Sequence, residues 1–100
     1  MSTRIILEKD IEAKFMKEAK KLGCITRKLN GMGFNSWPDR LVLVPGGTSL
    51  FIEFKKPGET LRPAQEALHK DAKSLGHTWY VCTSAENALN IVRQYIKHID

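Results

Sequence analysis

The chain has 100 residues, of which 42% are hydrophobic and 27% charged, so it predicts one soluble globular domain over residues 1–100 and is too short for two. Its formal net charge of +5 favours a polyanionic partner such as nucleic acid, because Lys and Arg neutralise phosphates. The two cysteines lack the spacing of metal ligands, so we expect no zinc site. The sequence has no signal-peptide pattern and no apolar run of about 18 residues, so we expect a cytoplasmic protein without a membrane partner.

The first predicted element is an amphipathic helix over residues 7–22, ended by Gly23. A short strand over residues 24–29 and a loop rich in glycine and asparagine over residues 30–36 follow it. The helix assignment depends on an apolar stripe at helical spacing, formed by Ile11, Phe15, Ala19 and Leu22.

The next segment predicts a β-hairpin with strands over residues 40–44 and 50–54. The turn between them is the cluster Pro45-Gly46-Gly47-Thr48. After a break over residues 56–60, Pro63 begins a helix that ends at Gly76, and a strand follows over residues 77–83. Ser84 is the expected cap of a last helix, whose apolar stripe is Ala88, Ile91, Val92, Tyr95, Ile96 and Ile99.

These elements give the order helix, strand, strand, strand, helix, strand, helix, which is typical of an α/β fold with a mixed sheet and flanking helices. The last strand follows the hairpin through a helix, so we expect it to lie parallel to the strand that ends at Phe54.

The hairpin also predicts a site for phosphodiester chemistry. Reversal of the chain at the two glycines brings Asp39 and Glu53 nearly opposite each other, and strand alternation points Glu53 and Lys55 to one face. The two carboxylates, with the Phe54 carbonyl between Glu53 and Lys55, are oxygen ligands suited to Mg²⁺ or Mn²⁺. Lys55 could orient the water or stabilise the transition state. On the hairpin alone, an exposed ion pair is the alternative interpretation.

A third carboxylate could come from the first helix. Glu12 borders the apolar stripe and can reach towards the sheet, and Glu8 lies one turn earlier on the same side. The alternative for Glu12 is an exposed helix position paired with Lys9 or Lys14.

Pro38-Asp39 followed by Glu53-Phe54-Lys55 resembles the PD-(D/E)xK signature of restriction-endonuclease-like nucleases. Over residues 8–85 the chain resembles the VRR-Nuc (virus-type replication-repair nuclease) family. Ser36-Trp37 departs from the glycine that members often carry two residues before the proline. The remaining matching segments are Ile11-Glu12, Leu22-Gly23, Pro45-Gly46-Gly47, Pro57-Gly58, Leu61-Arg62-Pro63, Gln65 and Leu75-Gly76.

The resemblance implies a PD-(D/E)xK fold in which Asp39, Glu53 and the Phe54 carbonyl bind metal and Lys55 is catalytic. It further implies that Glu12 is the helix acid of the site and that Gln65 acts near the metal. His69, one turn after Gln65, is a candidate contact to water or phosphate, or else a partly exposed helix residue. The predicted DNA contacts are Arg27, Lys28, Arg40, Lys56, Arg62 and His69.

Stand-alone members resemble Holliday-junction resolvases, so the resemblance implies a homodimeric, Mg²⁺- or Mn²⁺-dependent DNA endonuclease of a bacterial cell or phage-infected host. We expect it to act on four-way junctions in DNA repair or recombination. The alternatives are a flap- or nick-directed nuclease and an inactive nucleic-acid-binding or assembly module. Ile91, Tyr95 and Ile99, or the exposed side of the hairpin, are candidate dimer contacts, and Phe34 and Trp37 are candidates either for base stacking or for the core.

Overall fold

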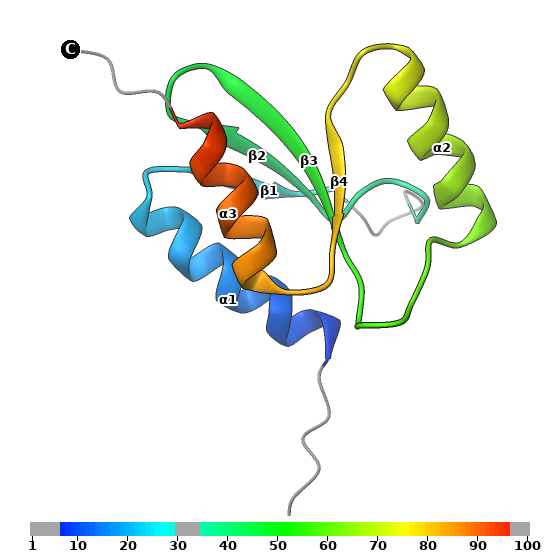
Figure 1. The fold of residues 1–100 in the computed structure, drawn as a ribbon, viewed down its shortest axis with the longest axis horizontal. Coiled ribbons are helices and arrows are strands. Elements are labelled where there is room, and N and C mark those ends of the chain that lie inside the picture. The colour runs from blue at the N-terminus through cyan, green and yellow to red at the C-terminus, as the bar shows by residue number, and fades with distance from the viewer. Residues whose placement is uncertain (1–6, 30–34, 97–100) are drawn as a thin grey trace, which may run out of the picture.

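The computed structural model describes residues 7–29 and 35–96, and the elements in these ranges follow the predicted order (Figure 1). The predicted loop residue Phe34 and helix residue Ile99 lie outside the described residues. The elements are α1 (Glu8–Lys21), β1 (Ile25–Lys28), β2 (Arg40–Val44), β3 (Thr48–Phe54), α2 (Pro63–Ser74), β4 (Trp79–Cys82) and α3 (Ala85–Tyr95).

The sheet is mixed, as predicted, with the strand order β1-β2-β3-β4. The first three strands are antiparallel, and β4 lies parallel to β3. Strand β3 begins earlier than predicted because Thr48, assigned to the turn, pairs with Val44. Strand β4 is shorter than the predicted range of residues 77–83.

One face of the sheet carries the hydrophobic core. Helices α1 and α3 lie side by side on this face (Figure 1) and bury their apolar stripes against alternate residues of β3. The rings of Phe15 on α1 and Phe54 on β3 pack with centroids 5.3 Å apart. Helix α3 begins at the predicted cap, where the backbone N–H of Asn87 donates to Ser84 Oγ at 3.0 Å.

The opposite face is covered only in part. Helix α2 packs there beside β4, and Gln65 is its one buried residue within the described range. Directly paired Ile25 and Leu43, on β1 and β2, remain exposed. No helix within residues 7–29 and 35–96 has the length and apolar character needed to cross a lipid bilayer.

Gly23 and Gly76, which follow α1 and α2, have φ angles of +89° and +88°. Both conformations favour glycine, because a Cβ crowds the backbone in the left-handed region. A Cβ at Gly23 would also lie 3.3 Å from the Pro45 side chain, whereas one at Gly76 would meet no atom within 4 Å.

We therefore expect Gly23→Ala to lower the unfolding free energy more than Gly76→Ala does. Gly76→Ala should cost about 1–2 kcal/mol from backbone strain alone. Gly23→Ala should cost more because the turn after β2 must also shift. Urea unfolding of both variants measures the difference, and equal losses would show that the contact with Pro45 is unimportant.

Candidate active site

The buried polar and charged side chains in the described part of the chain belong to one small group. They are Asp39, Glu53, Lys55 and Gln65. Burying ionisable groups lowers stability unless they are well paired, so a stable fold alone gives little reason for such a group. All of them were predicted as catalytic residues, and β3 with its neighbours brings them together.

The hairpin register places the two acids as predicted. Arg40 pairs with Ile52, so Asp39, one residue earlier, lies beside Glu53 on the face that α2 shares. The Phe54 backbone N–H donates to Asp39 Oδ2 at 2.7 Å. Since the N–H and C=O of a strand residue point to the same side, the Phe54 carbonyl also points towards the Asp39 side.

The two carboxylate oxygens of Glu53 have different surroundings. Oε2 accepts a hydrogen bond from Gln65 Nε2 at 2.9 Å and lies 3.3 Å from Lys55 Nζ. Gln65 is itself fixed, because its Oε1 accepts a hydrogen bond from the Arg62 backbone N–H at 3.1 Å. Oε1 of Glu53 is buried and has no hydrogen-bond partner among the described residues. Gln65 therefore holds Glu53 by one oxygen, and the other makes no hydrogen bond to the part of the chain that the structure describes.

Burial makes both acids harder to ionise. It is the main reason that the pKa of Glu53 rises to about 7, and the neighbouring Asp39 charge raises it further. Burial likewise raises the pKa of Asp39, against the opposing effect of the Phe54 N–H. A divalent cation would offset this repulsion and could accept a lone pair of Glu53 Oε1. These residues therefore fit a hard cation such as Mg²⁺ or Mn²⁺.

Glu12 lies at the edge of the site but is held by another residue. Arg40 Nε donates to Glu12 Oε2 at 2.6 Å, and Arg40 Nη1 donates to Thr26 Oγ1 at 3.3 Å. The Glu12 charge is still close enough to contribute to the raised pKa of Asp39. Within residues 7–29 and 35–96, no three His, Cys, Asp or Glu side chains are grouped closely enough to hold one metal ion. The predicted set of three carboxylate ligands is therefore not assembled in this conformation.

The predicted DNA contacts are distributed over both faces of the sheet. Arg27 is exposed on the same face as Glu53, whereas Lys28 pairs with Arg40 and so lies on the opposite face. Arg40 is engaged by Glu12 rather than exposed for a phosphate. Lys56 is exposed directly after Lys55.

Arg62 and His69 both belong to the α2 region but differ in what they contact. The exposed Arg62 donates through Nη2 to the Asn35 carbonyl at 2.7 Å. His69 Nε2 bonds to the Trp79 carbonyl at 3.0 Å, so this side chain contacts β4 and not the acids. A DNA contact by either residue stays a prediction.

Two further acids lie near the site. Burial and a hydrogen bond with Glu59 raise the pKa of Glu8, which also senses the charges of Lys55 and Asp39. The sequence indicates Glu8 by its position one turn before Glu12. No spacing rule indicates Glu59, because its position depends on how the segment after β3 folds back towards α1.

The raised pKa of Glu53 predicts that metal-free protein loses stability as the pH rises. The folded-state pKa of about 7 exceeds the ordinary value of 4.5, so the folded protein holds the Glu53 proton more tightly than the unfolded chain does. The stability that this proton contributes is fully present below pH 4.5 and is lost as the pH rises through about 7. In EDTA, the unfolding free energy of the wild type minus that of Glu53→Gln should fall by roughly 2–3 kcal/mol across this range. Urea unfolding at several pH values measures this difference, and a flat profile would contradict the assignment.

The Glu12–Arg40 pair should contribute more to stability than a surface pair. Its side chains are 14% and 12% exposed, compared with 36% and 63% for the Glu18–Lys21 pair. Double-mutant cycles with Gln for Glu and Met for Arg or Lys should give a coupling energy of at least about 1 kcal/mol for the first pair and about 0–0.5 kcal/mol for the second. Similar coupling in both cycles would show that Arg40 does not fix Glu12.

Comparisons with known proteins identify relatives by sequence and by fold. No family model matches the sequence. A protein of Acyrthosiphon pisum secondary endosymbiont phage 1, named "Putative nuclease p44", is 39% identical over 83 residues, which cover 83% of this chain and 89% of that protein.

Two solved structures share the fold. A structure described as a VRR_NUC domain has a TM-score of 0.77 and 26% identity, covering 88% of this chain and 96% of its own. A VRR_NUC domain protein has a TM-score of 0.74 and 18% identity, covering 94% of this chain and 91% of its own. With the phage relative, the fold and the site motif in agreement, the chain belongs to the VRR-Nuc family of the PD-(D/E)xK superfamily.

Proposed function

We propose that this protein is a Mg²⁺- or Mn²⁺-dependent endodeoxyribonuclease that selects branched DNA, with four-way junctions as its preferred substrate. The observation that carries the proposal is the buried pair Asp39 and Glu53, beside Lys55, with one Glu53 oxygen lacking a partner among the described residues. The name of the phage relative and the positive net charge support it.

Asp39, Glu53 and the Phe54 carbonyl would hold the cation. When bound, it would offset negative charge on the phosphate and lower the pKa of a coordinated water. The Phe54 N–H and Gln65 each fix one carboxylate, so the ligand oxygens are oriented before the substrate arrives. Gln65 thus acts through Glu53 as a positioning residue.

Lys55 would stabilise the negative charge that develops on the phosphate. Its ammonium is nearly buried and lies 3.3 Å from Glu53 Oε2, so it is already oriented at the carboxylate end of the site. A preorganised cation in a poorly solvated site interacts strongly with such charge. The same ammonium is also close enough to Glu53 to orient an attacking water.

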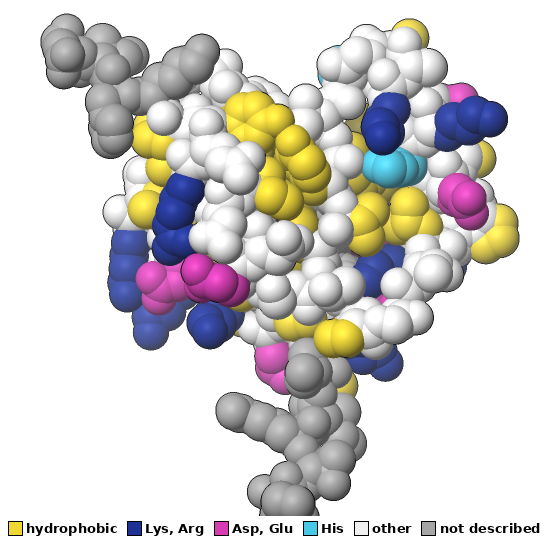
Figure 2. All heavy atoms as spheres, in the orientation of Figure 1, with side chains coloured by type: hydrophobic (Ala, Val, Ile, Leu, Met, Phe, Trp, Pro, Cys, Tyr) yellow, Lys and Arg dark blue, Asp and Glu magenta, His cyan; other side chains and the backbone are white. Residues whose placement is uncertain are grey.

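DNA would be positioned by its phosphates. Lys and Arg side chains gather over α1 and α2 on the face shown in Figure 2, and Arg27, Lys56 and Arg62 are exposed near the site. Phosphate contacts carry no sequence information, so selection by DNA shape is consistent with this surface. Two cuts across a junction require two sites, which a two-fold homodimer would supply. The exposed apolar residues Ile25 and Leu43 form a candidate contact for this dimer.

Lys55→Ala and Asp39→Ala should each lower the rate of junction cleavage by roughly 10²–10³-fold or more. Lys55→Ala removes a positive charge aimed at the reacting phosphate, and Asp39→Ala removes a proposed ligand of the cation. Both variants should still bind DNA. Arg93→Ala, which removes an exposed positive charge on α3 that is paired with Glu86, is the matched control and should cut at the wild-type rate. The assay compares a synthetic four-way junction with linear duplex and flap DNA, with and without Mg²⁺ or Mn²⁺.

Two outcomes would contradict the proposal. Equal cleavage of all three DNA forms would remove the preference for junctions while leaving a nuclease. Wild-type protein that binds DNA but never cuts it with either metal would instead be a binding module.

A further inference from the structure

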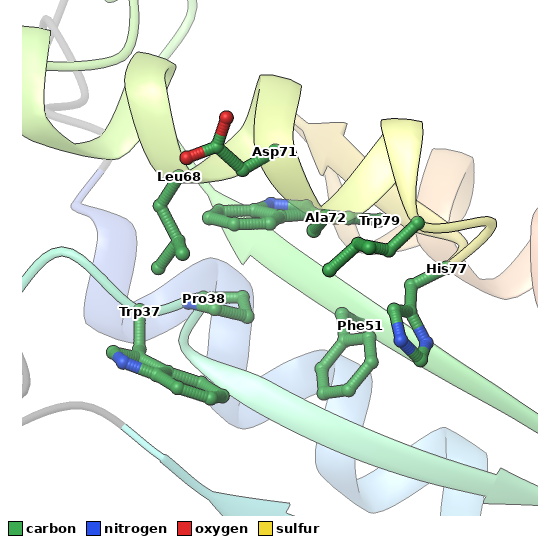
Figure 3. A pocket seen from close by; sticks show the side chains of 9 residues that line it. Trp37, Pro38, Phe51, Leu68, Asp71, Ala72, His77 and Trp79 are labelled. Carbon is green, nitrogen blue, oxygen red and sulfur yellow. The ribbon is translucent and has the colours of Figure 1, made fainter.

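A pocket of about 410 Å³ lies beside the acids, between α2, the sheet and the segment that leads to Asp39 (Figure 3). Trp37 and Pro38 form the wall nearest Asp39, and Phe51 on β3 and Trp79 on β4 belong to the sheet. Leu68 of α2 points into the pocket from the other side. The walls are therefore mainly aromatic and apolar.

The strand register connects this pocket to the candidate active site. Phe51 pairs with Trp79 on one side and Leu41 on the other, and Leu41 pairs with Arg27. This row lies on the same face as Asp39 and Glu53, two residues further along each strand, which is roughly 6–7 Å away. A nucleotide whose phosphate lies at the acids would therefore have its base within reach of the pocket, with exposed Arg27 in the same row.

The polar groups of the pocket suit a flat ring with donors and acceptors at its edge. The Asp71 carboxylate and the His77 ring lie in its lining and are exposed. Trp79 Nε1, in the sheet wall, is buried and has no hydrogen-bond partner among the described residues. A nucleobase presents both donors and acceptors at its edge, whereas an aliphatic side chain from a protein partner presents neither.

Two histidines pack against the aromatic residues of the sheet wall. The His69 ring packs edge-on against Trp79 with centroids 4.9 Å apart and bonds to the Trp79 carbonyl. Phe51 makes a similar edge contact with His77 at 6.2 Å. Trp37, which is 43% exposed, offers an accessible aromatic ring.

We propose that this pocket receives an unpaired nucleobase of the DNA strand bound at Asp39 and Glu53, with Trp37 as its stacking partner. The inference rests on the proposed function, because the acids must bind the neighbouring phosphate. An unpaired base enters without the cost of breaking a base pair. The pocket thereby selects DNA that is branched or distorted.

Tryptophan fluorescence tests this directly, because both tryptophans of the chain line the pocket. Lys55→Ala protein, which should not cut, is titrated with a duplex carrying one bulged base and with the same duplex carrying an abasic residue there. The bulged base should quench the fluorescence and bind about tenfold tighter or more. Trp37→Leu should remove this preference, whereas Trp37→Phe should keep most of it.

Leu7→Ala is the control, since Leu7 is a comparably exposed apolar residue, at 38%, that precedes α1 and lies outside the pocket lining. It should leave the preference for the bulged base unchanged. Equal affinity for both duplexes, or equal effects of Trp37→Leu and Leu7→Ala, would overturn the proposal. Fluorescence that follows protein concentration and dimer mass, without responding to DNA, would instead assign the pocket to a second copy of the chain.

Wild-type cleavage of the bulged duplex is measured separately. If the wild type cuts no DNA while the Lys55→Ala protein keeps the base preference, the proposed nuclease function fails and the base pocket stands. If the wild type cuts DNA but the base preference is absent, the base pocket fails and the proposed nuclease function stands.

Discussion

The structure must offset the repulsion between two buried carboxylates, and the other features of the site depend on how it does so. Asp39 and Glu53 lie side by side at the end of a hairpin, where burial disfavours the charge of each. The Phe54 N–H and the Gln65 amide offset part of this cost, and Lys55 contributes an opposite charge. The apolar core under the other face of β3 provides the stability on which such an arrangement depends. One face of the sheet thus carries the apolar core that stabilises the fold, and the other carries the two acids whose ionisation is disfavoured by burial.

Strand periodicity explains why much of this could be predicted from the sequence. The turn glycines set the hairpin register, and the register alone places Asp39 beside Glu53 and turns Lys55 to the same face. The same rule, applied one residue further, would have directed Arg40 away from the acids, where it meets Glu12. Its predicted DNA contact followed from nearness in sequence, which in a strand is a poor guide to which face a side chain occupies.

What local patterns could not predict is how the elements pack on one another. Helical spacing correctly put Gln65 and His69 on one face of α2, but it could not show that one reaches Glu53 and the other Trp79. The approach of Glu59 to Glu8 depends on an irregular segment that returns towards α1. Contacts of this kind arise from tertiary packing, for which local patterns carry no information.

The two side-chain hydrogen bonds of α2 to the sheet have a mechanical consequence. The helix has little buried surface of its own, yet it holds Glu53 through Gln65 and the wall tryptophan through His69, one turn later. A small tilt of α2 would move both attachment points at once. One turn of a single helix therefore links the acid pair to the aromatic pocket, so the spacing of Gln65 and His69 along α2 relates the positions of the two sites.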